Sequence, residues 1–146
     1  MIRNTLDPAS QHGIVLITPT GRVAFQWRDR ETGVTRSVGS DANSVALPHW
    51  VRLTRKGNQF TAQHSSDGAQ WNTVVDPQDP NKPTFIEIPM NETVYIGLTV
   101  TSHSATRAAE ARLSNVRLTG SVNPPGPFAH SKDISFETPP DNSTNK

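Results

Sequence analysis

The stretch from His49 to Trp71 constrains the fold more than any other part of this 146-residue chain. Apolar and polar residues alternate over Trp50–Lys56 and again after Gly57-Asn58, as in half-buried strands whose successive side chains point to opposite faces. Gly57-Asn58 and Asp67-Gly68 suit tight hairpin turns, because Gly and Asn accept a positive φ at little cost. The stretch therefore predicts two consecutive hairpins, the building unit of an antiparallel sheet.

Similar patterns predict strands along most of the chain before residue 120. Further strands are expected over residues 13–18, 22–28, 34–38, 71–75, 84–88, 93–101 and 107–118. Ala105–Leu113 has helical propensity, but it lacks the apolar stripe that a packed helix needs. We therefore predict an all-β fold with roughly eight or nine strands, as expected for an antiparallel β-sandwich or a jelly roll.

The composition changes after residue 120. The last 26 residues hold five of the twelve prolines. Such a segment buries too little apolar surface to offset the entropy lost on ordering. We predict one domain over residues 1–119 and a proline-rich linker or tail over 120–146, in which Ile134-Ser135-Phe136 is compatible with a short strand.

Charge and composition argue against several kinds of partner. The net charge is +1 and the basic residues are scattered, so no nucleic-acid partner is expected. The absence of cysteine excludes disulfides and thiolate metal sites. No apolar run approaches the ~18 residues that span a bilayer, so no membrane partner is expected. No signal peptide is visible at the N-terminus, and the sequence alone assigns no compartment.

Three blocks of the sequence carry a resemblance to a known family. They are MIRNTLDPASQHGIVLITPTGRVAFQWR, HWVRLTRKGNQFTAQHSSDGAQW and VYIGLTVTSHSATRAAEARLSNVRL, which together cover most of residues 1–119. In order and spacing they resemble the DUF1349-like, concanavalin A-like lectin/glucanase jelly rolls of bacteria, which occur as modules of exported proteins. The resemblance implies a concanavalin A-like jelly roll and an extracellular location, but no single activity.

The resemblance also implies that this sandwich is incomplete. In that family a segment like Met1–Asn4 lies inside a strand, and a substantial part of the domain precedes it. A jelly roll without those strands exposes unpaired backbone and apolar surface. We therefore expect the chain to form a homodimer or to pair with a strand-completing partner.

Aromatic residues are the first candidates for ligand binding, because their faces pack on the apolar face of a sugar ring. The candidates are Trp27, Trp50, Trp71 and Tyr95. Trp50 shares a predicted face with Arg52, so these two are the best surface candidates. Trp27 shares a face with Phe25 and is expected in the core, as is Trp71. The turn before Trp71 resembles an Asp-box, a hairpin that is usually structural.

Polar groups at predicted loop ends form a second candidate set. Arg3, His12 and His103 recur in the motifs of the resembled family, and Arg28 stands at a strand end. These groups could converge at one rim of the sandwich and bind a glycan. Alternatively, they bond backbone carbonyls in the loops.

The sequence predicts no metal site and no cofactor. No histidine pair has the spacing of a zinc site. Asp76 and Asp79 in the proline-rich loop could contribute to a Ca²⁺ site, which needs several more oxygens, and a solvated loop is the alternative.

No catalytic residues are predicted. Retaining glycosidases need two carboxylates about 5 Å apart, and the glucanases of this architecture carry an E-x-D-x-E strand. Here Glu87, Glu92 and Glu110 are isolated, and neither G-x-S-x-G nor a P-loop occurs. We expect a non-catalytic module that binds carbohydrate or mediates interactions. The alternatives are a fragment of a glycoside-processing enzyme and a purely structural spacer domain.

Overall fold

The computed structural model describes residues 1–41, 43–76, 85–120 and 133–135. Within these ranges every regular element is a β-strand. The described part of the chain contains no helix long and apolar enough to cross a membrane. The chain divides into two compact units, Met1–Leu98 and a second that begins at Thr99.

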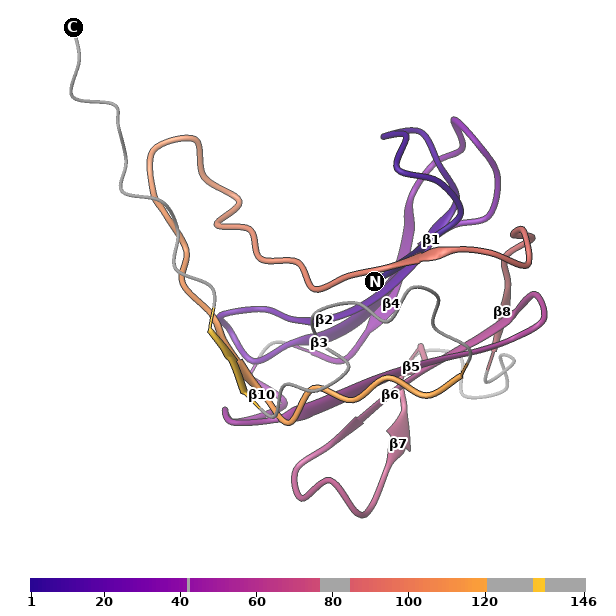
Figure 1. Ribbon diagram of the computed structural model, residues 1–146. Helices are drawn as coiled ribbons and strands as arrows, with labels where there is room; N and C mark the ends of the chain where they lie inside the picture. The colour runs from indigo at the N-terminus through magenta and orange to yellow at the C-terminus, as the bar shows by residue number, and fades with distance from the viewer. Residues whose placement is uncertain (42, 77–84, 121–132, 136–146) are drawn as a thin grey trace, which may run out of the picture. The chain divides into compact units, whose positions relative to one another are not determined.

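The first unit contains a five-stranded antiparallel sheet with the order β4-β3-β2-β1-β9 (Figure 1). Its strands are β1 (Ile2–Arg3), β2 (His12–Ile17), β3 (Val23–Arg28), β4 (Arg36–Gly39) and β9 (Tyr95–Ile96). The register places Val15, Phe25 and Val38 in one row across three strands. These apolar side chains share the face that packs into the core.

The second sheet of this unit is built on the predicted central hairpin. Its strands are β5 (Trp50–Lys56), β6 (Gln59–Ser65), β7 (Asn72–Thr73) and β8 (Ile86–Glu87), and β6 pairs with all three others. Gly57 has a φ of 61° at the first position of the two-residue turn between β5 and β6, where type II′ turns carry glycine. The prediction of this hairpin is confirmed.

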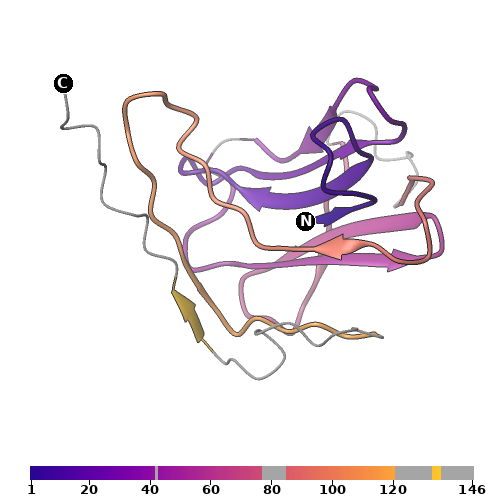
Figure 2. The same cartoon turned by 45° about the horizontal axis from the view of Figure 1, so that its top comes forward.

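The two sheets pack face to face around one apolar core (Figure 2). Val23 and Phe25 of β3 meet Phe60 of β6 and Ile88 in a cluster of buried side chains. Gly13 of β2 lies directly against the second sheet, because a Cβ at this position would be 3.1 Å from Cδ1 of Phe60. The predicted all-β, antiparallel sandwich is therefore confirmed.

Several predicted strands are shorter in the structure, and the two longest predictions are reduced the most. The strand expected over 93–101 is reduced to β9, because its partner β1 has only two residues and Gly97 donates one further bond to the carbonyl of Met1. The strand expected over 107–118 is reduced to β10 (Arg112–Ser114). The alanine-rich residues before it offer little side-chain surface to a sheet.

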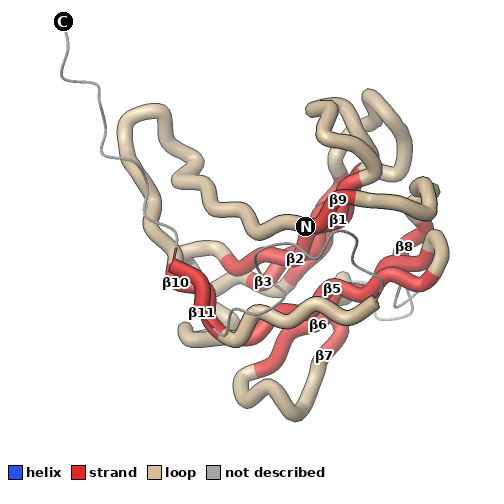
Figure 3. The backbone as a smooth tube through the Cα atoms, in the orientation of Figure 1, coloured by secondary structure: helices blue, strands red, loops and turns tan. Residues whose placement is uncertain are grey.

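In the second unit, β10 pairs antiparallel with β11 (Asp133–Ser135) (Figure 3). The strand considered possible over Ile134-Ser135-Phe136 thus includes Ile134 and Ser135, whereas Phe136 lies outside the described residues. The prediction of a domain boundary at residue 120 stays a prediction.

Candidate functional site

Four side chains lie together on the outer face of the second sheet, and they come from two strands, β5 and β6, and from the residue that precedes β7. Trp50 and Arg52 of β5 point away from the buried residues of the hairpin, and the register places Gln63 of β6 opposite Arg52. Trp71 lies on the same face, because it stands two residues before Thr73, the partner of Gln63. We call Trp50, Arg52, Gln63 and Trp71 the tryptophan–arginine surface.

Arg52 is held in a fixed orientation between two neighbours. Its Nε–H and an Nη2–H donate to Oε1 of Gln63 at 2.9 and 2.7 Å. Its Cζ lies 4.0 Å from the ring centroid of Trp71, within the range of a cation–π contact. The guanidinium therefore stacks on an aromatic ring while the residue as a whole stays exposed.

The turn after β6 is fixed by the Asp67 carboxylate. Its Oδ1 accepts hydrogen bonds from the backbone N–H groups of Gln70 and Ala69, at 2.9 and 2.8 Å, and from Oγ of the buried Ser65 at 2.8 Å. The N–H of Gln70, then that of Ala69, then the Ser65 hydroxyl hold the pKa of Asp67 below its usual range. The turn is thus built around an ionised side chain.

Gly68 of this turn positions both indoles of the surface. It has a φ of 74°, and a Cβ at this position would lie 3.0 Å from Cε2 of Trp50, so the Trp50 ring packs directly on the glycine backbone. The Nε1–H of Trp71 donates to the carbonyl oxygen of Gly68 at 3.1 Å. Trp50 remains 37% exposed, whereas Trp71 is half-buried.

The four aromatic candidates from the sequence do not lie on one common surface of the structure. The expectation that Trp71 lies in the core is wrong, because the neighbouring Val74 is buried and the alternation of β7 places Trp71 on the opposite face. Trp27 packs against the core with its ring 5.3 Å from that of Phe25. Tyr95 belongs to the other sheet, where it pairs with Arg3.

Gln63 was not among the candidates, although the sequence holds a signal for it. A two-residue turn at Gly57-Asn58 fixes the register of the hairpin, and counting outward from that turn places Gln63 opposite Arg52. The polar partner of the predicted Arg52 could therefore have been found from the turn alone.

Arg3, His12 and Arg28 form a row across three strands, because Arg3 pairs with His12 and His12 pairs with Arg28. All three contact carbonyls of the loop between β1 and β2. Arg3 donates to two of them, Arg28 Nη1 donates to Pro8 at 2.7 Å, and His12 Nδ1 lies 3.3 Å from the carbonyl oxygen of Ser10. Three of the four polar candidates thus come together, and their side chains bond carbonyls of this loop, which is the alternative that the sequence left open.

The surroundings of His12 disfavour its protonated form. Burial lowers the pKa of His12, the charges of Arg28 and Arg3 lower it further, and the hydrogen bond with Ser10 opposes the shift. No contact of these groups points to a ligand, so their binding role stays a prediction.

The remaining sequence candidates lie elsewhere. His103 belongs to the second unit, where it is exposed and its N–H donates to Oγ1 of Thr101 at 3.2 Å. Asp79, of the candidate Ca²⁺ pair, lies outside the described residues. Over the described ranges, no three His, Cys, Asp or Glu side chains gather in a way that could hold a metal ion.

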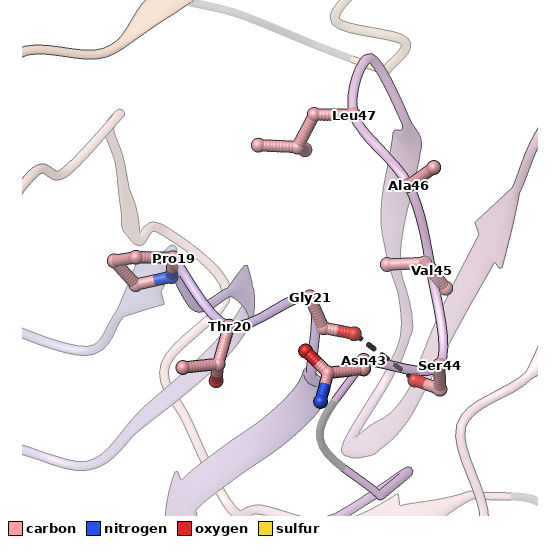
Figure 4. A pocket seen from close by; sticks show the side chains of 8 residues that line it. All are labelled: Pro19, Thr20, Gly21, Asn43, Ser44, Val45, Ala46 and Leu47. Carbon is pink, nitrogen blue, oxygen red and sulfur yellow. Dashed lines mark hydrogen bonds between the residues drawn. The ribbon is translucent and has the colours of Figure 1, made fainter.

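An open depression of about 340 Å³ lies beside the first sheet (Figure 4). Residues 19–21 and 43–47 line it. Asn43 N–H donates to the Thr20 carbonyl at 2.6 Å, and Ser44 Oγ donates to the Gly21 carbonyl at 3.1 Å. These bonds join the two segments, and no ionisable side chain lines the depression, so it offers no acid–base chemistry.

No family model, no curated protein and no solved structure matches this chain. The fold and the surface together define a class: a two-sheet β-sandwich that displays a preorganised tryptophan–arginine surface on one outer face.

Proposed function

We propose that this chain is a non-catalytic module that binds carbohydrate through the tryptophan–arginine surface. The observation that carries the proposal is the presence of two indoles on one outer sheet face, one of them stacked with the Arg52 guanidinium and the other packed on Gly68. The C–H face of a pyranose packs on aromatic rings, and Arg52 and Gln63 beside the rings supply hydrogen bonds to its hydroxyls.

The rigidity of the surface also supports binding. Trp50 packs on Gly68, Trp71 donates to the same residue, and Gln63 fixes Arg52. Ordering side chains on association costs about 0.5–1.5 kcal/mol for each one immobilised. Side chains that are already held lose less of this free energy when a ligand arrives.

The sequence resemblance supports a finer proposal about the fold and its context. We infer from the three matching blocks that the sandwich is a concanavalin A-like jelly roll and that the protein acts as a module outside the cell. Jelly rolls of this type serve both lectins and glucanases, so the proposal of binding without catalysis rests on the surface and not on the fold.

The experiment is a glycan array with the full chain, followed by isothermal titration of the best ligand. We expect Trp50→Ala to weaken binding at least about tenfold, because truncating an aromatic anchor typically costs more than 1 kcal/mol. Tyr95→Ala is the matched control, since Tyr95 is 51% exposed but lies on the other sheet, and it should leave affinity unchanged.

Each failure has a distinct meaning. A folded protein that binds no glycan would contradict the proposal and favour a structural spacer. Release of reducing ends from a bound glycan would favour the glycoside-processing alternative.

A further inference from the structure

Arg52 is a fixed cation that its neighbours do not neutralise. Its acceptor is the amide oxygen of Gln63, which carries no charge. The ion pair found among the described residues joins Arg36 to Asp29 at 2.6 Å and does not involve Arg52. The surface therefore presents a positive charge whose position is already set.

The hydrogen bonds of Arg52 leave one side of its guanidinium available. The group carries five N–H donors, and Gln63 takes Nε–H and one Nη2–H. Three N–H groups remain, and two of them, one on Nη1 and one on Nη2, form an end-on fork. Such a fork fits the two oxygens of a carboxylate in plane, and Trp71 holds that plane by stacking on it.

The other charged residues on this face of the sheet lie away from Arg52. Lys56 and Glu87 stand at the opposite end, next to the Gly57-Asn58 turn, as the register shows. The Asp67 carboxylate belongs to the turn, where three donors bind its Oδ1. Arg52 is thus the cation that stands beside the two indoles.

We propose that the tryptophan–arginine surface selects acidic polysaccharides, and that the Arg52 fork binds the carboxylate of a uronic acid while Trp50 stacks on the sugar ring. This inference rests on the proposed glycan binding and adds the chemical class of the ligand. Pairing with a carboxylate neutralises Arg52, which no described side chain does.

The test compares polygalacturonate with its fully methyl-esterified form, because the two polymers share a backbone and differ in the charge of the carboxyl group. Affinity electrophoresis or titration of the full chain should give binding of the acid at least about tenfold tighter than of the ester. Arg52→Gln should remove the difference. Gln63→Glu should remove it too, because the new carboxylate occupies and neutralises Arg52 while both indoles remain.

Two further comparisons test whether Arg52 recognises a carboxylate in particular. Arg52→Lys keeps the charge but loses the fork, so it should retain only part of the preference. Dextran sulfate against dextran tests other anions, and an equal gain for the sulfated polymer would overturn the carboxylate assignment. Thermal unfolding checks that each variant is folded, and because Arg52 is exposed we expect small changes.

The outcomes separate this inference from the proposed function. Equal binding of the acid and the ester would overturn the acidic preference and leave glycan binding standing. Binding of neither polymer, and of no glycan on the array, would overturn both.

Discussion

Two histidines meet at the edge of the core, on the face of the β5–β6 hairpin opposite the tryptophan–arginine surface. Nε2 of His49 lies 3.0 Å from Nδ1 of His64, so one nitrogen donates to the other and the two rings cannot both be protonated in this contact. Burial lowers the pKa of His64 from its usual 6.5, and the charge of His49 lowers it further.

This lowered pKa predicts how stability depends on pH. Below pH 6.5 the unfolded chain binds a proton at His64, whereas the lowered pKa disfavours this proton in the folded protein. The contribution of His64 to the free energy of unfolding is therefore fully present above this pH. This contribution is lost as the pH falls from 6.5 through the pKa that His64 has in the folded protein. The lowered pKa of His12 acts in the same direction.

We expect the melting temperature of the wild type to fall between about pH 7 and about pH 5, and the fall to be smaller in His64→Gln. His103→Gln, on an exposed histidine of the second unit, is the control and should follow the wild type. Identical slopes for His64→Gln and the wild type, measured by calorimetry, would contradict the assignment.

At the scale of elements, two tight turns with a glycine at positive φ perform different tasks. Gly57 has a φ of 61°, and a Cβ there would meet nothing within 4 Å. Gly68 has a φ of 74° and packs against the Trp50 indole. Both glycines relieve backbone strain, but only Gly68 also positions the tryptophan–arginine surface.

The two glycines provide a matched pair of variants. Gly57→Ala and Gly68→Ala should each destabilise the fold by about 1–2 kcal/mol, because L-residues resist the left-handed region. Only Gly68→Ala should also weaken glycan binding, since its methyl group displaces Trp50. Chemical denaturation and titration measure the two effects separately, and equal affinity in both variants would show that Trp50 does not need this contact.

An element could be predicted from the sequence when the residues that determine it lie in one short segment. The β5–β6 hairpin could be predicted, because alternation and the Gly57-Asn58 turn lie in one short segment. The length of β9 could not, because it depends on the two-residue β1 far away in the sequence. The position of Trp71 was missed, because the alternation of the two-residue β7 is set by its pairing with β6 and not by its own pattern.

The candidate site was predictable to the same extent. Trp50 and Arg52 share a strand, so alternation alone places them together. Gln63 can also be placed from the sequence, because the Gly57-Asn58 turn fixes the register of the hairpin. Trp71 joins them only through the pairing of β7 with β6 and the Asp67 turn. The apolar–polar alternation within one strand does not show which side chains it contacts on the neighbouring strands.

At the scale of the whole molecule, two apolar residues on the inner faces of the sandwich remain exposed. Val51 lies opposite His64 on the core side of its sheet and is 38% exposed, and Ile96 pairs with the buried Ile2 and is 52% exposed. The exposed apolar surface is consistent with the expectation, drawn from the resemblance, of a second copy or a strand-completing partner.

We therefore expect the chain to associate at micromolar concentration in light scattering. Ile96→Thr should shift it toward the monomer, because it removes apolar surface from β9, the edge strand of the first sheet among the described residues. Leu6→Thr is the control, since Leu6 is 70% exposed in a loop. A clean wild-type monomer would contradict the expectation.

The proposed binding of glycan to the outer face of the β5–β6–β7 sheet can be tested directly with the three tryptophans. In a ¹H–¹⁵N spectrum each indole gives one Nε1–H signal. Titration with the best glycan should shift the signals of Trp50 and Trp71 and leave that of Trp27, which packs against the core, unchanged. Saturable binding that leaves the signals of Trp50 and Trp71 unshifted would place the ligand elsewhere and contradict the proposed binding surface.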